Sequence, residues 1–508
     1  MSDSNPLYKL DTVAVHMALL PTNKVIVFSG DDNEIWKWWK GKSSVWDPQP
    51  PNKEEKSSSV RNLFCAGHCL LPDGRLLVAG GQSTVHHIAP AIASFFGLLQ
   101  IFTKGADHDI NIFDPQKNRW NPETVDSKPV AKMPKARWYP TCITLPDGKA
   151  LIVSGISSQA HYAFLKRLGR FAFINEDYEI FDPETNELST PEPFLKGIRA
   201  YPFLQVLPGG TLLVHYGNTT KLWNIDEKKF SSKEFTTELK GTRTYNGMGS
   251  CVLLPILPND KTVQVLLVGG STSLTPNKET PATNQSEIFE FNPDAPNESK
   301  WCKTKHPTNI PRFMSDSVLL PDGTVLVTNG AGKGISDHNS CSVKIVELFN
   351  PKTETWKMVD TIRKDRLYHG TAILLPDGTV AVAGSTGHDW PPSNNEKNLE
   401  IITPPYLENI TTRLTIKCPT SISYNSSFQI TTDNVDTIEN ISLIRVSSTT
   451  HNNNMDQRCL FLDILEKSDN VIKLQSPKDG TWAPPGYYML FAIDKKGIPS
   501  VGEFVRLN

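Results

Sequence analysis

Reactive side chains recur at one fixed distance before a proline that belongs to a repeated motif. Counting back seven positions from Pro72, Pro146 and Pro376, the residues reached are Cys65, Tyr139 and His369. Tyr368 directly precedes the last of them. If the stretches are copies of one unit arranged around an axis, a thiol, two phenols and an imidazole meet at one end of that axis. Imidazole with oxygen donors in a square arrangement suits Cu(II), so these residues predict a copper site.

A second imidazole would complete such a site, and His451 is the candidate. It lies in the polar segment 447–458, whose Ser, Thr and Asn residues predict a turn. We expect this turn to reach from the C-terminal part of the chain into the axis of the repeats. The same count of positions gives Tyr201 and Met314 in two more copies of the motif, and both should share the rim.

The neighbours Tyr368 and His369 impose a geometric condition. Successive residues of a regular strand point to opposite faces, so both can face the axis only at a strand end or a bulge. Each candidate also has an ordinary role when taken alone. A buried tyrosine packs, a lone cysteine is a small apolar residue, and a histidine in a polar turn is solvated. The shared register is what favours one joint site.

The repeated motif is a β-hairpin. Most copies read Leu-Pro-Asp-Gly followed by a short apolar run that ends in glycine, and such a turn between apolar runs is typical of a hairpin. The copies begin at Leu19, Leu70, Thr144, Val206, Leu253, Leu319 and Leu374. Most are followed by β-rich runs that end in Asn-Pro, Asp-Pro or Trp, which adds two outer strands to each unit. This kelch-like repeat predicts a seven-bladed β-propeller over residues 1–404.

The repeat stops after residue 404. Residues 405–508 contain short runs in which apolar and polar residues alternate between turn residues. This pattern is typical of an immunoglobulin-like β-sandwich. The sequence therefore predicts an all-β chain, in which a kelch-type propeller carries most of the copper site and a C-terminal sandwich donates His451.

The composition excludes several partners and sites. A net charge of −2 over 508 residues predicts no nucleic-acid surface, and no apolar run is long enough for a membrane-spanning helix. The eight cysteines include no Cys-x-x-Cys pair, so a structural zinc site is not expected. The first residues show no signal peptide, which predicts a cytoplasmic protein unless a leader is missing from this sequence.

Five motifs, in this order along the chain, resemble the copper radical oxidases, the group of galactose oxidase and glyoxal oxidase. They are Phe-Cys-Ala-Gly at 64–67, Ala-Arg-Trp-Tyr-Pro at 136–140, Arg-Leu-Tyr-His at 366–369, Thr-His-Asn-Asn-Asn-Met-Asp-Gln-Arg at 450–458 and Ala-Pro-Pro-Gly-Tyr-Tyr-Met-Leu-Phe at 483–491. The resemblance covers essentially the whole chain, and Arg-Trp-Tyr-Pro is closer to the glyoxal oxidase type.

The resemblance implies a role for each residue. Cys65 and Tyr139 would form a thioether-linked pair that holds a stable radical, and Tyr139 would also bind copper. Tyr368 would be the axial ligand and the base that takes the proton of the substrate hydroxyl. His369 and His451 would be the two imidazole ligands. The expected cofactors are therefore one copper ion and the protein-derived Cys-Tyr radical.

The implied reaction is the two-electron oxidation of a small aldehyde (as its hydrate), a hydroxy-carbonyl compound or a primary alcohol, with reduction of O2 to H2O2. The family is usually secreted, which leaves the compartment open, and a monomer is expected. Galactose oxidase stacks a tryptophan on its radical cofactor. Here no Trp occurs between Trp138 and Trp223, and the residues that could replace it are His161, Tyr162 or Phe164.

A non-catalytic function is the alternative. A kelch propeller can also serve as a binding module for a protein or a glycan, with the same repeats and the same buried aromatic residues. Such a module predicts no copper uptake and no thioether bond.

Overall fold

The computed structural model describes residues 5–30, 41–57, 61–84, 104–123, 127–157, 174–336, 338–386 and 395–508. Within these residues the chain is almost entirely β-structure, with short 3-10 helices at η2 (Pro296–Glu298), η3 (Pro405–Leu407) and η4 (Val435–Thr437). In the described part of the chain, no helix is long and apolar enough to cross a membrane.

Each copy of the predicted hairpin forms two adjacent strands of its own antiparallel sheet. The first blade is β2 (His16–Leu19), β3 (Val25–Gly30), β4 (Gly41–Trp46) and β5 (Glu54–Lys56). The second is β6 (Gly67–Leu70), β7 (Leu76–Ala79), β9 (Lys104–Asp114) and β10 (Arg119–Asn121), with β8 (Gln82–Thr84) and β11 (Ala131–Arg137) also paired to β9. The third is β12 (Thr141–Thr144), β13 (Ala150–Val153), β14 (Asp177–Asp182), β15 (Glu187–Leu188) and β16 (Glu192–Pro193).

The next three blades follow the same order of strands. The fourth is β17 (Phe203–Leu207), β18 (Thr211–Tyr216), β19 (Thr219–Asn224) and β20 (Lys229–Thr236). The fifth is β21 (Ser250–Leu253), β22 (Val263–Val268), β23 (Ser286–Phe291) and β24 (Lys300–Lys303). The sixth is β25 (Asp316–Leu319), β26 (Val325–Thr328), β29 (Ile345–Asn350) and β30 (Thr355–Thr361), beside a separate hairpin of β27 (Ala331–Ile335) and β28 (His338–Ser342).

The last blade joins the two ends of the propeller sequence. It consists of β31 (Gly370–Leu374), β32 (Val380–Gly384), β33 (Asn398–Ile402) and β1 (Leu7–Lys9). Strand β1 pairs antiparallel with β33, with Leu7 opposite Glu400. The N-terminal segment therefore supplies the outer strand of the last blade and closes the ring.

The first strands of the blades lie around a common axis. Strand β31 contacts β2 and β25, β25 contacts β21, and β12 contacts both β6 and β17. Every residue of β6, β12 and β31 is buried, because neighbouring blades cover both faces of an inner strand. This explains why the inner hairpins read as nearly continuous apolar runs.

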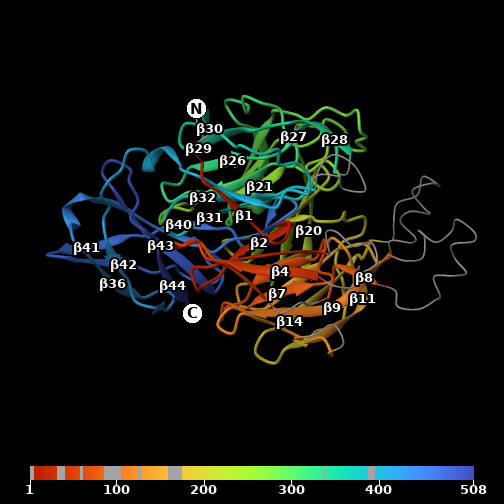
Figure 1. Ribbon diagram of the computed structural model, residues 1–508, viewed down its shortest axis with the longest axis horizontal. Helices are drawn as coiled ribbons and strands as arrows, with labels where there is room; N and C mark the ends of the chain where they lie inside the picture. Colours follow the sequence, from red (N-terminus) through yellow and green to blue (C-terminus); the bar gives the residue numbers. More distant parts are fainter. Residues whose placement is uncertain are drawn as a thin grey trace, which may run out of the picture.

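The C-terminal part folds as two facing sheets. One contains β34 (Ile416–Lys417), β36 (Ser427–Thr432), β42 (Val471–Gln475) and β41 (Ile464–Ser468). The other contains β35 (Ser421–Ile422), β44 (Glu503–Leu507), β43 (Gly486–Asp494), β37 (Ile438–Arg445) and β40 (Cys459–Phe461). In Figure 1, β36, β41 and β42 lie at the opposite end of the molecule from β8 and β11 of the propeller. The predicted all-β chain of a propeller followed by an immunoglobulin-like sandwich is confirmed, and the domain limits 1–404 and 405–508 stay a prediction.

One hairpin of the C-terminal part leaves the sandwich and enters the propeller. Strand β38 (Ser448–Thr450) pairs with β39 (Asn453–Asn454) and also with β2 of the first blade. Strand β38 contacts β6 and β31 as well, and β39 contacts β21 on another side of the ring. The hairpin therefore lies along the axis among the inner strands, as the sequence predicts for the turn that carries His451.

Buried ion pairs tie four of the blades together from within. In each, an arginine ahead of the first strand pairs with a glutamate on the third strand, and all eight side chains are fully buried. The pairs are Arg137 with Glu179, Arg243 with Glu287, Arg312 with Glu347 and Arg366 with Glu400. Each arginine also donates to backbone carbonyls of its own blade, which satisfies groups that water cannot reach.

Candidate metal centre

The five predicted site residues meet at one end of the propeller axis. The Cys65 Sγ lies 3.4 Å from His451 Nε2 and 3.9 Å from His369 Nε2, and these three ligand atoms all lie within 4.8 Å of one another. The Tyr139 and Tyr368 hydroxyls are 2.9 Å apart, and the centroids of both rings lie 5.3 Å from that of His451. Each of these side chains is at most 2% exposed.

Left-handed turns, and not the strands themselves, present the residues of the shared register. The φ angles of Cys65, Tyr139, Tyr201, Met314 and His369 are +59°, +64°, +46°, +57° and +67°. All five precede the first strand of their blade. The residues of the shared register therefore lie in turns just ahead of the innermost strands, and not within those strands.

The turn also explains how Tyr368 and His369 both reach the centre. The Gly370 N–H donates to the Leu367 carbonyl at 3.0 Å, which closes a turn with His369 at its third position. Positive φ at that position is the mark of a type II turn. The strand-end condition that the sequence imposes on these neighbours is therefore met.

His451 lies in a two-residue loop between the paired strands of a β-hairpin. Thr450 pairs with Asn453, so His451 and Asn452 form a two-residue loop, and their φ angles are +50° and +63°. Positive φ at both loop residues defines a type I′ turn, whose twist matches that of the flanking strands. The imidazole thus projects from the tip of a hairpin that is itself held along the axis.

Hydrogen bonds orient both imidazoles. The Nδ1 of His369 lies 2.8 Å from the Thr386 hydroxyl, and the Nδ1 of His451 lies 2.6 Å from the Thr450 hydroxyl. Both Nε2 atoms therefore point to the Cys65 thiol, and such partners fix metal-binding histidines in proteins. Burial lowers the pKa of His369 to about 3 and that of His451 well below its usual value, so both rings are neutral with a lone pair to offer.

The donor set fits a copper ion. Two imidazole nitrogens lie beside the Cys65 thiol, and the rings of two phenols with adjacent hydroxyls lie next to His451. Copper accepts such mixed nitrogen and oxygen ligands.

Comparison with known proteins agrees with this geometry. Residues 102–406 match the family model described as glyoxal oxidase N-terminus, and residues 413–507 match the model of the galactose oxidase-like Early set domain. The chain belongs to the glyoxal oxidase family. Aldehyde oxidase GLOX1 of Arabidopsis thaliana is 31% identical over 411 residues, which cover 73% of this chain and 63% of that protein. Galactose oxidase of Gibberella zeae is 24% identical over 545 residues, which cover 99% of this chain and 70% of the relative.

A solved structure supports the fold of this family member along its whole length. A fungal alcohol oxidase of the AA5 family, determined in complex with copper, superposes with a TM-score of 0.77 at 22% identity and covers 99% of this chain and 98% of its own. The chain spans 46% of a WSC domain-containing protein of Arthroderma benhamiae, to which it is 30% identical over 88% of its own length. It therefore corresponds to about half to two thirds of the first curated relatives that it matches.

The remaining residues of the motif at 450–458 anchor the hairpin of β38 and β39, which carries His451. The Leu70 N–H donates to Asp456 Oδ2 at 2.8 Å, the Leu319 N–H donates to Gln457 Oε1 at 2.7 Å, and Arg458 donates to the Val206 carbonyl. These partners lie at the ends of inner hairpins from three different blades. The sequence assigned only His451 of this motif, and it missed this structural role.

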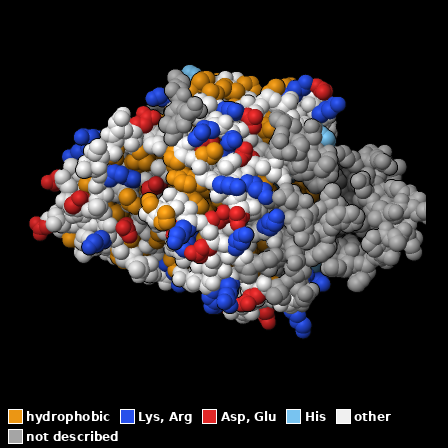
Figure 2. All heavy atoms as spheres, viewed as in Figure 1, with side chains coloured by type: hydrophobic (Ala, Val, Ile, Leu, Met, Phe, Trp, Pro, Cys, Tyr) orange, Lys and Arg blue, Asp and Glu red, His pale blue; other side chains and the backbone are white. Residues whose placement is uncertain are grey.

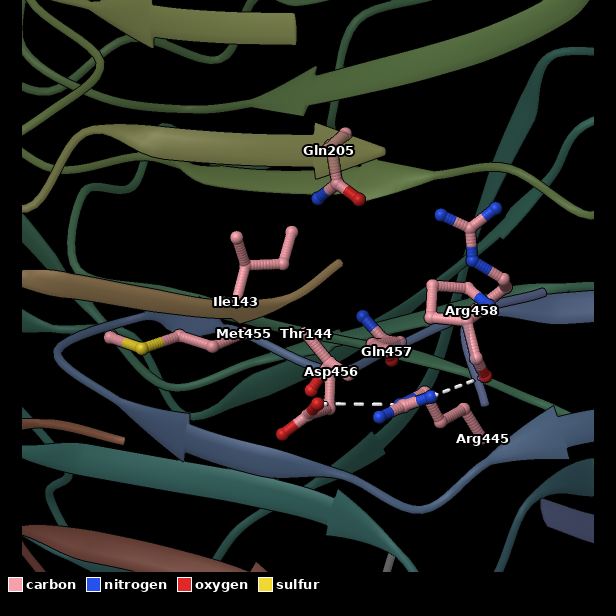
Figure 3. A pocket seen from close by; sticks show the side chains of 9 residues that line it. Ile143, Thr144, Gln205, Arg445, Met455, Asp456, Gln457 and Arg458 are labelled. Atoms are coloured by element: carbon pink, nitrogen blue, oxygen red, sulfur yellow. Dashed lines mark hydrogen bonds and ion pairs between the residues drawn. The ribbon is translucent and has the colours of Figure 1, made fainter. Parts of the chain in front are cut away.

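A small cavity lies beside this anchor. Figure 3 shows Met455, Asp456, Gln457 and Arg458 around it, with Arg445 facing Asp456. The Arg445 Nε donates to Asp456 Oδ1 at 3.3 Å, and both side chains are at most 2% exposed. Burial raises the pKa of Asp456 to about 6 even though the arginine charge lowers it. The ion pair connects the sandwich strand β37 to the hairpin.

Aromatic rings surround the Tyr139 phenol. The centroids of Trp138, Tyr245 and Tyr201 lie 4.1, 4.5 and 5.0 Å from that of Tyr139. Trp138 and Tyr245 are half-buried, so they form the solvent side of the centre together with Phe64, whose ring lies 5.0 Å from His369. The other residues suggested for a stacking role, His161, Tyr162 and Phe164, lie outside the described residues.

Sequence reasoning missed one residue at the centre itself. His16, the first residue of β2, accepts a hydrogen bond at Nε2 from the Cys65 N–H at 3.1 Å. Its ring is fully buried and its centroid lies 6.0 Å from that of His451. The count of positions that found the other residues gives Ala14 in this blade, so the register alone could not identify His16.

Proposed function

We propose that the chain is a copper radical oxidase of the glyoxal oxidase type. It removes two electrons from a small aldehyde (as its hydrate), a hydroxy-carbonyl compound or a primary alcohol and passes them to O2, which leaves as H2O2. The observation that carries the proposal is the meeting of Cys65, Tyr139, Tyr368, His369 and His451 around one buried point. These residues come from three blades and from the sandwich, so chance packing is a poor explanation.

Each residue has a task in this proposal. His369 and His451 would hold copper through Nε2, and Tyr139 and Tyr368 would hold it through their hydroxyl oxygens. When bound, copper would act as a Lewis acid on the substrate hydroxyl and store one electron. The ring of Tyr139, linked by a thioether to Cys65, would store the other electron.

Tyr368 would take the proton of the substrate hydroxyl at its Oη atom. Its hydroxyl lies 2.9 Å from that of Tyr139, so a substrate hydroxyl held beside Tyr139 would lie within reach of this base. The half-buried rings of Phe64, Trp138 and Tyr245 would exclude water from the centre.

Two measurements test the proposal. Protein loaded with Cu(II) in air should consume O2 and release H2O2 with a panel of small aldehydes and primary alcohols. Its intact mass should fall by that of the thiol hydrogen and one ring hydrogen. Tyr139→Phe should abolish O2 consumption. The control Tyr424→Phe, which removes a hydroxyl bound to the Ala483 carbonyl in the sandwich, should keep it.

The opposite result would favour the other function. If the protein takes up no copper and its mass does not change, the site is not an oxidase centre. The propeller would then be a non-catalytic binding module for a protein or glycan. Full activity in Tyr139→Phe would refute the radical mechanism even if copper binds.

A further inference from the structure

The backbone amide of Cys65 is held in a way that differs from its counterparts in three other blades. The Tyr139 N–H donates to the Cys65 carbonyl at 2.9 Å, and the Tyr201 N–H donates to the Tyr139 carbonyl at 3.0 Å. The Met314 N–H donates to the Met248 carbonyl at 2.6 Å. Each of these rim amides therefore binds the carbonyl at the same register position of the preceding blade.

At Cys65 a side chain replaces this carbonyl. The register position of the preceding blade is Ala14, and its carbonyl accepts from the Thr371 hydroxyl at 3.1 Å. The Cys65 N–H donates to His16 Nε2 at 3.1 Å. Because the amide and the imidazole are both buried, this bond is not exchanged for one to water.

The His16 imidazole is stacked on a neighbouring aromatic ring. Its ring lies parallel to that of Phe28, with 4.6 Å between centroids and 5° between planes. On the backbone, His16 is paired with Thr450, whose hydroxyl binds the Nδ1 of His451. Since Nε2 accepts from the amide, the proton of the neutral ring lies on Nδ1. His16 thus stands between the Cys65 turn and the hairpin that presents His451.

We propose that His16 is a positioning residue for Cys65. By accepting the amide of Cys65 it holds the left-handed turn that places the thiol at the centre, and it thereby speeds formation of the thioether to Tyr139. In that step the Sγ–H bond and a ring C–H bond break and an S–C bond forms. Two electrons and two protons pass to O2, which becomes H2O2. The inference rests on the proposed function, because it needs copper and O2 at this centre.

The test follows thioether formation and not turnover. Protein purified without copper receives copper(II) sulfate in air-saturated buffer, and the loss of two hydrogens is followed by intact mass. His16→Leu removes the imidazole that accepts from the Cys65 amide, so this variant should form the thioether about tenfold more slowly per folded molecule. A rate equal to that of the unchanged protein would overturn the inference.

The chain offers a matched control on another blade. His215 on β18 is also fully buried, with its ring at 12° to Phe203 and its Nδ1 bound to the Thr220 hydroxyl. His215→Leu should lose packing in the same way and keep the rate of thioether formation. A slowing equal to that of His16→Leu would overturn the positioning role.

A conservative pair keeps the test decisive if His16→Leu does not fold. In His16→Gln the amide oxygen occupies roughly the place of Nε2, whereas in His16→Asn it lies near the place of Nδ1. The Gln variant should form the thioether within about threefold of the original rate and the Asn variant should remain slow. Equal rates in the two would overturn the inference. If the unchanged protein loses no mass, the proposed function fails, and the inference fails with it.

Discussion

Both ends of the inner hairpins use left-handed backbone, but they use different amino acids there. At the turn end the left-handed residue is a glycine of the Pro-Asp-Gly turn: φ is +87° at Gly74, +86° at Gly148, +85° at Gly323 and +84° at Gly378. At the axis end of five hairpins it is Cys65, Tyr139, Tyr201, Met314 or His369. Glycine adopts this conformation freely, whereas any other residue costs about 1–2 kcal/mol there.

The difference shows where side-chain chemistry outweighs backbone preference. At the turn end nothing but the reversal of the chain is required, and glycine suffices. At the axis end the strained position turns a side chain toward the centre, directly ahead of the strand. Non-glycine residues persist in such conformations only where surrounding structure holds them. Here the buried arginines that precede Tyr139, Met314 and His369 supply that support.

A ligand change at the axis end should have the largest effect. His369→Asn keeps a residue that tolerates positive φ but removes the imidazole. We expect copper affinity to fall at least about a hundredfold and O2 consumption to fall to background. Copper content after gel filtration measures this, and the thermal unfolding of the metal-free protein serves as the control for folding. Retention of full copper content would refute His369 as a ligand.

The support of the axis end can be broken without touching a proposed ligand. Arg312 Nη2 donates to Glu347 Oε2 at 2.6 Å, and Arg312→Met would leave this buried carboxylate without its counter-charge, with only the Asn309 donors at Oε1. We expect the free energy of unfolding to fall by about 3–5 kcal/mol, while copper content per folded molecule stays unchanged. Urea denaturation measures the loss.

The double variant Arg312→Met/Glu347→Leu is the control for this pair. It removes both charges, so it should recover much of the stability. If the double variant is as unstable as the single one, the loss comes from packing and not from the unpaired charge.

A buried carboxylate at the axis end makes stability depend on pH. Burial raises the pKa of Asp316 to about 8, although donors from Asn329 and Asn452 lower it. The folded protein then holds a proton that the unfolded chain releases near pH 4. The contribution of Asp316 to stability is therefore fully present below the unfolded pKa, and it is lost by about 1.4 kcal/mol per pH unit up to about pH 8.

The variant Asp316→Asn isolates this contribution. It cannot titrate, so urea denaturation between pH 5 and 8 should show a flatter slope than in the original protein. An unchanged slope would assign the pH dependence to other groups.

The turn end should show the smallest effect. In Gly378→Ala the added Cβ would meet nothing closer than Arg413 Nη2 at 3.4 Å, so only the positive φ is unfavourable. We expect a loss of about 1 kcal/mol in the free energy of unfolding, with copper content and O2 consumption unchanged. A loss of copper in this variant would contradict the separation of the two ends.

The buried arginine–glutamate pairs were not predicted from the sequence, although a repeated pattern in the sequence corresponds to them. The glutamates of the buried ion pairs recur in the third strands, as in Glu179-Ile-Phe, Glu287-Ile-Phe and Glu347-Leu-Phe, and an arginine precedes the first strand of the same blades. A search for charged residues at fixed positions of the repeat would have found them. His16 left no such trace, because its role depends on one hydrogen bond to the Cys65 amide that no repeated pattern in the sequence marks.

The near balance of positive and negative charges on the surface can be expected from the amino-acid composition. On the face shown in Figure 2, Lys and Arg side chains are interspersed with Asp and Glu, as expected from a net charge of −2. The sequence holds 52 Lys and Arg residues against 54 Asp and Glu residues, so both signs of charge are available in almost equal number.

By itself the sequence determined the repeat, the all-β fold and the register that brings Cys65, Tyr139 and His369 to one end of the axis. Turn residues and the pattern of apolar residues specify these features, and both can be recognised from residues close together in the sequence. Only the tertiary structure decided that left-handed turns present these residues and that His16 accepts the Cys65 amide. It alone shows how the hairpin of His451 is anchored to several blades. The physical reason is that these contacts join residues distant in sequence. Such residues become neighbours only when the blades close into a ring.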